Sequence, residues 1–150
     1  MAATNSATAH INTLERDLGE IVGREHVLTS APDRLAYNND CWPRGIILTR
    51  GQQVRKHQPA AVVLPKNEHE VLAIVQWARQ TGTPIVPYGA GSGVCGGALT
   101  DGEGVIVDLK RLKKIVATRE GDLTMRAQSG IIGMNMELEL NRRGFTLGHY

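Results

Sequence analysis

Glycine dominates one short stretch of this 150-residue chain, VPYGAGSGVCGG from Val86 to Gly97. Five of the chain's 17 glycines fall within nine residues there, directly after an apolar run that is typical of a strand. Without Cβ atoms, successive backbone N–H groups can turn toward one side and bind an anion such as a phosphate. Ser92 would add a hydroxyl donor. The residue types and their spacing therefore predict a phosphate-binding loop.

Two other nucleotide-binding motifs share part of this spacing. The span Gly91–Gly96 matches G-x-G-x-x-G, but in a Rossmann unit the third glycine lies in a helix, and here LTDGEG follows soon after. Asp108 lies inside the next strand, with no room for a crossover helix before it. The same span has P-loop spacing, yet Gly97 and Ala98 stand where that motif needs Lys and Ser or Thr. A loop whose own backbone is the anion site is favoured over both motifs and over a wide turn without a ligand.

Other reactive side chains form no second motif. The two cysteines, Cys41 and Cys95, are far apart and belong to no CxxC pair, which excludes a disulfide scaffold and a cysteine-based zinc site. The five histidines show no spacing to carboxylates or cysteines that is typical of a metal site. We therefore expect no metal.

A β-α-β unit must position the glycine loop. Residues 60–65 are predicted as a strand, and Asn67 with Glu70 as the capping box of a helix that ends at Gly82. Residues 83–88 are predicted as the strand that enters the loop, parallel to the first. The other expected elements are a helix from 11 to 22, a short helix from Ser30, an irregular connection over 37–45, a strand over 104–109, a hairpin over 115–128 and a helix over 132–144. This order predicts an α+β fold.

Composition excludes several function classes. Hydrophobic residues make up 41% of the chain and charged residues 21%, as in a globular domain. The net charge of +2 and the aromatic content of 4% are too low for a nucleic-acid surface with stacking side chains. The N-terminus has no secretory pattern, and no apolar run reaches the roughly 20 residues of a membrane helix. We expect a cytoplasmic protein without a nucleic-acid partner or a membrane span.

Several spaced motifs after residue 59 resemble one flavoprotein family. PIVPYGAGSGVCGGAL is followed by GVIVDLKRLKKI and then by LTMRAQSGI. Their order and letters are similar to the FAD-binding domain of the vanillyl-alcohol-oxidase type, also called PCMH-type. That family includes glycolate and D-lactate dehydrogenases and alkyldihydroxyacetonephosphate synthase. The resemblance covers residues 59–150. It implies FAD as the cofactor and an α+β fold, with a β-α-β subdomain followed by the start of a mixed β/α subdomain.

The resemblance also implies which residues bind FAD. The loop would hold the pyrophosphate, and Gly130 and His149 would lie near the flavin or its adenylate. Many members have Gly-Thr-Ser or Gly-Thr-Gly where this chain has Gly91-Ser92-Gly93, so a hydroxyl is kept at Ser92. The expected cofactor-binding residues are Pro87, Tyr88, Gly89, Ala90, Gly91, Ser92, Gly93, Val94, Gly130 and His149.

The function implied by the resemblance is that of an FAD-linked oxidase or dehydrogenase, with 2-hydroxy acids among the candidate substrates. The stretch NNDCWPRGIILTRGQQVRKHQPAAVVLPKN looks most like the synthase branch. That branch implies the alternative of a transferase, in which the flavin serves as a covalent electrophile without net redox change and the substrate is an acyl-dihydroxyacetone phosphate. A truncated fragment without catalytic function is the third hypothesis.

The resemblance divides the chain in two. Residues 1–58 are expected to be a helical and irregular lead-in, and residues 59–150 the N-terminal part of the FAD-binding domain, incomplete at its C-terminus. In the family, a further glycine-rich segment and a substrate domain follow. The catalytic residues are therefore expected beyond Tyr150, and this chain alone is expected to be inactive. A small-molecule substrate is the expected partner of a longer parent protein, and a homodimer stays open.

Overall fold

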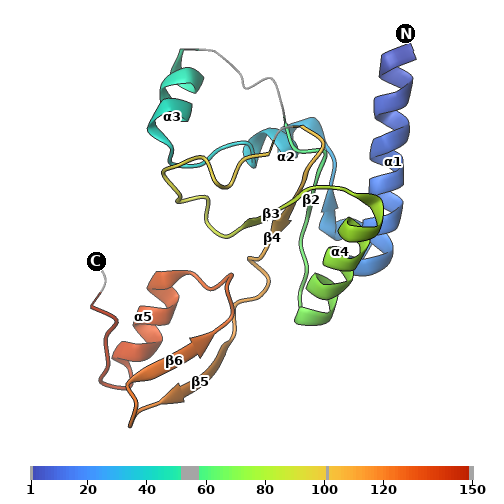
Figure 1. The fold of residues 1–150 in the computed structure, drawn as a ribbon. Coiled ribbons are helices and arrows are strands. Elements are labelled where there is room, and N and C mark those ends of the chain that lie inside the picture. Colours follow the sequence, from blue (N-terminus) through green and yellow to red (C-terminus); the bar gives the residue numbers. More distant parts are fainter. Residues whose placement is uncertain (1, 52–57, 101, 149–150) are drawn as a thin grey trace.

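A mixed sheet forms the centre of the molecule (Figure 1). The structure is a computed structural model and describes residues 2–51, 58–100 and 102–148. The strand order is β1–β2–β4–β3, and β1 is antiparallel to β2 whereas β2, β4 and β3 run parallel. The bounds are Val27–Leu28 for β1, Ala61–Val63 for β2, Ile85–Tyr88 for β3 and Val105–Asp108 for β4. The parallel direction of β2 and β3 is confirmed, and β4 lies between them.

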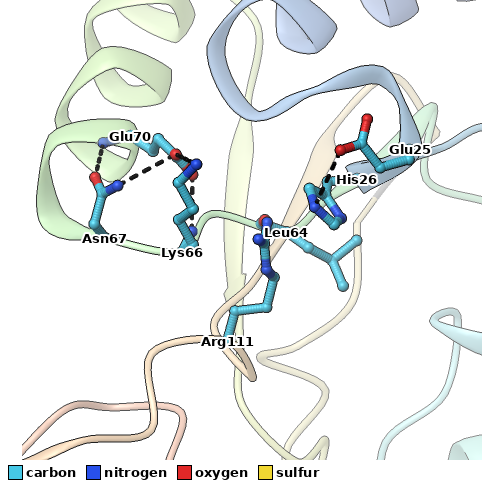
Figure 2. A network of polar contacts seen from close by, with 7 residues as sticks. All are labelled: Glu25, His26, Leu64, Lys66, Asn67, Glu70 and Arg111. Atoms are coloured by element: carbon cyan, nitrogen blue, oxygen red, sulfur yellow. Dashed lines mark hydrogen bonds and ion pairs between the residues drawn. The ribbon is translucent and has the colours of Figure 1, made fainter.

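Helix α4, Glu68–Thr81, connects β2 to β3 and has the ends that the sequence predicts. The side chain of Asn67 accepts a hydrogen bond from the backbone N–H of Glu70 at 2.9 Å. The Glu70 carboxylate accepts from the backbone N–H of Lys66 at 2.8 Å, one residue earlier than in a standard capping box (Figure 2). Gly82 ends the helix in the left-handed conformation, with φ 71°. These caps fix where the chain enters β3.

The hydrophobic core joins the N-terminal helix to the sheet. Helix α1, Ala2–Val22, is followed by the short 3-10 helix η1, Arg24–His26. Leu14 and Leu18 of α1 are buried in the same cluster as Ile74 of α4, Ala61 and Val63 of β2, and Val105 and Val107 of β4. Burial of each leucine side chain contributes about 2 kcal/mol. Residues before 59 thus share their core with residues after it, and the division of the chain at residue 58 stays a prediction.

Two short helices lie between β1 and β2. Helix α2, Ala31–Ala36, begins as predicted at Ser30, whose side chain accepts a hydrogen bond from the N–H of Asp33. The prediction of an irregular connection holds for residues 37–42 only, since helix α3, Pro43–Arg50, begins inside the expected range. Proline is well suited to a first helical turn, where its missing N–H has no helical partner to lose.

A smaller unit follows the sheet. Strands β5, Ile115–Arg119, and β6, Thr124–Ala127, form the predicted antiparallel hairpin, and helix α5, Gly133–Asn141, follows it. Residues 109–114 join this unit to β4 (Figure 1). The guanidinium of Arg111 donates to the carbonyl of Leu64 at 2.8 Å and so holds this connection to the end of β2 (Figure 2). Within the described ranges, no helix combines the length and the apolar character that crossing a bilayer requires.

Candidate cofactor site at the glycine loop

The glycine loop, defined here as residues 89–98, leaves the carboxyl end of β3 and leads toward β4. It therefore lies at the carboxyl edge of the parallel strands, where open α/β sheets bind their ligands. Most of its residues are exposed, including Ser92 and Val94. Pro87, which lacks an N–H, stands in β3 at the edge of the sheet, where a missing donor costs no ladder hydrogen bond.

The backbone N–H groups of the loop are available to a ligand. From Gly89 to Ala98, none of them donates to an acceptor in the described parts of the chain. Buried amides almost always have a partner, whereas amides that line a site keep their donors for the ligand or for water. A run of donors at a glycine-rich turn is the arrangement that binds phosphate groups.

Three loop glycines have no structural reason to lack a side chain. An ideal Cβ at Gly89, Gly93 or Gly97 would meet no protein atom within 4 Å, and none of these residues has a left-handed φ. An alanine would thus fit the protein but would fill the space beside the loop. The missing side chains leave room for a ligand to approach the main chain closely. These residues fit a dinucleotide pyrophosphate.

Gly91 and Gly96 are glycines for other reasons. Their φ angles are 65° and 81°, in the left-handed region. A Cβ on Gly91 would lie 2.1 Å from the hydroxyl oxygen of Tyr88, so the Tyr88 side chain passes directly beside this glycine. The ring of Trp42 lies 3.5 Å from the ideal Cβ position of Gly96. Both glycines therefore shape the loop and its packing.

Residues 37–42, named here the brace segment, lie against the glycine loop. The backbone N–H of Cys41 donates to the carbonyl of Gly93 at 2.9 Å. The hydroxyl of Tyr88 donates to the carbonyl of Asn39 at 3.2 Å. The sequence predicts the irregular course of the brace segment but carries no signal that it contacts the loop.

A buried carboxylate lies behind these contacts. Asp108, the last residue of β4, is fully buried, and Lys110 lies 3.0 Å from it through its ammonium group. The Tyr37 hydroxyl donates to Asp108 and accepts from the Lys110 ammonium at 2.9 Å. The rings of Tyr37 and Tyr88 pack edge to face, with centroids 5.0 Å apart. The sequence motifs involve Asp108 only through the Rossmann comparison, although a lone carboxylate that ends an apolar strand is itself a signal of a buried polar contact.

Tyr37, Tyr88 and Lys110 each have a raised pKa and so keep their protons near neutral pH. Burial raises the pKa of Tyr37 above its ordinary value, and its hydrogen bond to Asp108 raises it further. The Tyr37 hydroxyl raises the pKa of Lys110. Burial also raises the pKa of Tyr88. The tyrosines therefore remain hydrogen-bond donors and the lysine remains a cation beside Asp108.

Gly130 and His149, the two predicted residues far from β3 and the loop in sequence, have different outcomes. Gly130 is buried, and a Cβ there would lie 1.6 Å from the carbonyl oxygen of Leu109. Close packing of backbone on backbone thus accounts for this glycine, and its place near the flavin stays a prediction. His149 lies outside the described residues.

Comparisons with known proteins identify the family of this chain. Residues 59–150 match the family described as FAD binding domain. Alkyldihydroxyacetonephosphate synthase of Caenorhabditis elegans is 42% identical over 96 residues, which cover 61% of this chain and 16% of that protein. Glycolate oxidase subunit GlcD of Bacillus subtilis (strain 168) is 28% identical over 131 residues, or 87% of this chain and 26% of that one.

Solved structures show the same relationship. A structure of alkyldihydroxyacetonephosphate synthase superimposes with a TM-score of 0.80 and 28% identity, over 89% of this chain and 25% of that chain. p-Cresol methylhydroxylase, at 20% identity and a TM-score of 0.68, shares the fold. The α+β prediction is confirmed. The chain spans about a quarter or less of the length of these relatives. Since the family match covers more than half of the chain, this chain belongs to the FAD binding domain family, and its cofactor is FAD.

Proposed function

We propose that the glycine loop binds the pyrophosphate of FAD and that the protein is an FAD-linked oxidoreductase acting on a small-molecule substrate. The observation that carries the proposal is the run of loop N–H groups that have no acceptor among the described residues, beside Gly89, Gly93 and Gly97, which face open space. When bound, FAD supplies the redox chemistry, and the protein supplies binding and orientation. The proposed FAD contacts are Pro87 and Tyr88 at the end of β3 and Gly89, Ala90, Gly91, Ser92, Gly93 and Val94 of the loop.

Each part of the loop has a distinct task in this proposal. The backbone amides would donate hydrogen bonds to the phosphate oxygens, and the exposed hydroxyl of Ser92 would add a further donor. Gly89 and Gly93 let the phosphates approach the main chain. Tyr88 supports the loop from beside Gly91. In this proposal the loop orients the dinucleotide.

Gly93→Val tests the proposal directly. Its Cβ meets no protein atom within 4 Å, and its φ is not left-handed, so the fold should tolerate valine. In the native protein, expressed from its full coding sequence, we expect FAD affinity to fall by about 100-fold, or about 2.8 kcal/mol. Flavin fluorescence titration measures the affinity, and thermal unfolding of the apoprotein checks the fold.

The matched control is Gly121→Val in the β5–β6 turn, where a Cβ also meets no atom within 4 Å. It should leave FAD affinity unchanged. An unaltered affinity in Gly93→Val, with both variants folded, would remove the loop from the FAD site.

A flavin-dependent transferase is the second candidate function. It is favoured by the 42% identity to one alkyldihydroxyacetonephosphate synthase and by the TM-score of 0.80 to another. The oxidoreductase is favoured by glycolate oxidase subunit GlcD, whose match covers 87% of the chain. Anaerobic addition of a panel of 2-hydroxy acids separates the two. Bleaching of the flavin absorbance by any of them supports the oxidoreductase. A flavin that stays oxidised with all of them, but whose spectrum changes with an acyl-dihydroxyacetone phosphate, supports the transferase.

We also propose a cytoplasmic location for the parent protein. Cys41 and Cys95 are both free and exposed, as is usual in a reducing compartment. Cell fractionation tests the location, and light scattering of the purified protein tests whether it is a homodimer.

A further inference from the structure

The brace segment precedes the residues matched to the family, yet it contacts the glycine loop. The match begins at residue 59, and the brace segment ends at residue 42. The contacts are the hydrogen bonds from Cys41 to Gly93 and from Tyr88 to Asn39, and the packing of Trp42 beside Gly96. The loop position is therefore set in part by residues outside the matched domain.

The loop has little internal structure to hold it in place. Apart from its contacts with the brace segment, the loop has one backbone hydrogen bond among the described residues. In it, the N–H of Leu99 donates to the carbonyl of Gly96 at 3.2 Å. A glycine-rich chain loses more conformational entropy on ordering than any other. A ligand that bound an unordered loop would have to supply that ordering free energy, and its affinity would fall.

The brace segment is itself fixed at Tyr37. The Tyr37 hydroxyl donates to the fully buried Asp108 and accepts from Lys110. Asp108 also accepts from the backbone N–H of Lys110 at 2.9 Å, so its carboxylate is held on several sides. Strand β4 has neighbours on both edges and all its residues are buried. The brace segment is thus tied to an inner strand of the sheet.

We propose that Tyr37 is a positioning residue for FAD binding, which holds the brace segment on Asp108 so that the glycine loop is ordered before the cofactor arrives. The inference rests on the proposed function of the loop. It extends the cofactor site to a residue that lies 50 positions or more before the loop in sequence. A contact of this kind raises affinity by lowering the cost of ordering, without touching the ligand.

Tyr37→Phe in the native protein tests the inference. It removes the hydroxyl but keeps the ring that packs on Tyr88 and lies 4.8 Å from the Lys110 ammonium. We expect FAD affinity to fall by about 10-fold. In the apoprotein, the amide of Cys41 should exchange its hydrogen about 10-fold faster, since its bond to Gly93 is loosened. Amides of β4 should exchange as before.

A stability control separates positioning from general weakening of the fold. Gly82→Ala places a Cβ on a left-handed residue at the end of α4, away from the loop. It should lower the melting temperature and leave both the FAD affinity and the Cys41 exchange rate unchanged. If Tyr37→Phe lowers the melting temperature but leaves the FAD affinity and the Cys41 exchange rate unchanged, the inference is overturned. If Tyr37→Phe does not fold, Lys110→Met weakens the same contact by removing the ammonium group that donates to the Tyr37 hydroxyl. Unchanged FAD affinity together with an unchanged Cys41 exchange rate in that variant overturns the inference too.

The two proposals can fail separately. If Gly93→Val binds FAD normally, the proposed role of the loop fails. If Gly93→Val loses FAD while Tyr37→Phe binds it normally, the loop binds FAD and Tyr37 does not position it.

Discussion

Neighbouring glycines of the loop have different physical roles. Gly91 has a left-handed φ, and Tyr88 occupies the place where its Cβ would lie, so its replacement disturbs the scaffold of the loop. Gly93 has neither constraint, so a side chain there would occupy only the space proposed for the ligand. Loss of FAD binding in a Gly91 variant would therefore be ambiguous, whereas loss in a Gly93 variant is specific.

Gly130→Ala should destabilise the protein strongly, whether or not FAD is present. A Cβ 1.6 Å from the carbonyl oxygen of Leu109 forces one backbone away from the other. We expect a loss of at least about 3 kcal/mol in the free energy of unfolding, at the upper end of overpacking costs. Urea denaturation measures it. Gly133→Ala, where a Cβ meets no atom within 4 Å, is the control. Equal stability of the two variants would contradict the packing seen here.

At the scale of elements, the brace segment and β4 are joined by a titratable contact. Tyr37 and Lys110 both have a pKa raised in the folded protein, and Asp108 is the carboxylate that faces them. For both groups the folded state holds its proton more tightly than the unfolded state. Their stabilisation is therefore fully present below the unfolded pKa and is lost as pH rises through the folded pKa.

Alkaline pH should weaken this contact. The ordinary pKa values of tyrosine and lysine, 10.0 and 10.5, mark the start of the window. The difference in unfolding free energy between the native protein and Tyr37→Phe should be constant from pH 7 to about pH 10 and should shrink above it. Urea denaturation from pH 7 to pH 11 measures this difference. A difference that grows above pH 10 would show that Tyr37 is stabilised as a phenolate.

At the scale of the whole molecule, the strands of the four-stranded sheet and those of the smaller β5–β6 unit are buried to different degrees. Every residue of β2 and β4 is buried, whereas β5 and β6 contain no buried residue. Leu123 and Met134 of the smaller unit are 78% and 66% exposed. A largely apolar hollow of about 330 Å³ lies beside the hairpin, lined by Met125, Leu140 and Phe145 among others. Apolar surface of this kind is typically covered by other protein.

Residues 1–150 on their own should bind an apolar dye and hold FAD weakly. The loop is mostly exposed, and a tight site buries most of its ligand. The test uses the purified segment. Dye fluorescence measures the exposed apolar surface, gel filtration with FAD measures how much cofactor is retained, and an assay measures activity. A double change of Leu123 and Met134 to serine should reduce dye binding and leave FAD binding as it was. Stoichiometric FAD retained by a monomer that binds no dye would contradict this expectation.

Local signals in the sequence determine much of this protein. The caps at Asn67 and Gly82, the β-α-β unit, the hairpin and the glycine loop all depend on residues a few positions apart, and the family resemblance follows from their order. Tertiary structure alone decides that β4 lies between β2 and β3 and that Tyr37 meets Asp108. Tyr37 and Asp108 are 71 residues apart and Tyr88 and Asn39 are 49 apart. No periodicity or cap connects residues at such separations, because only the packing of the sheet brings them together.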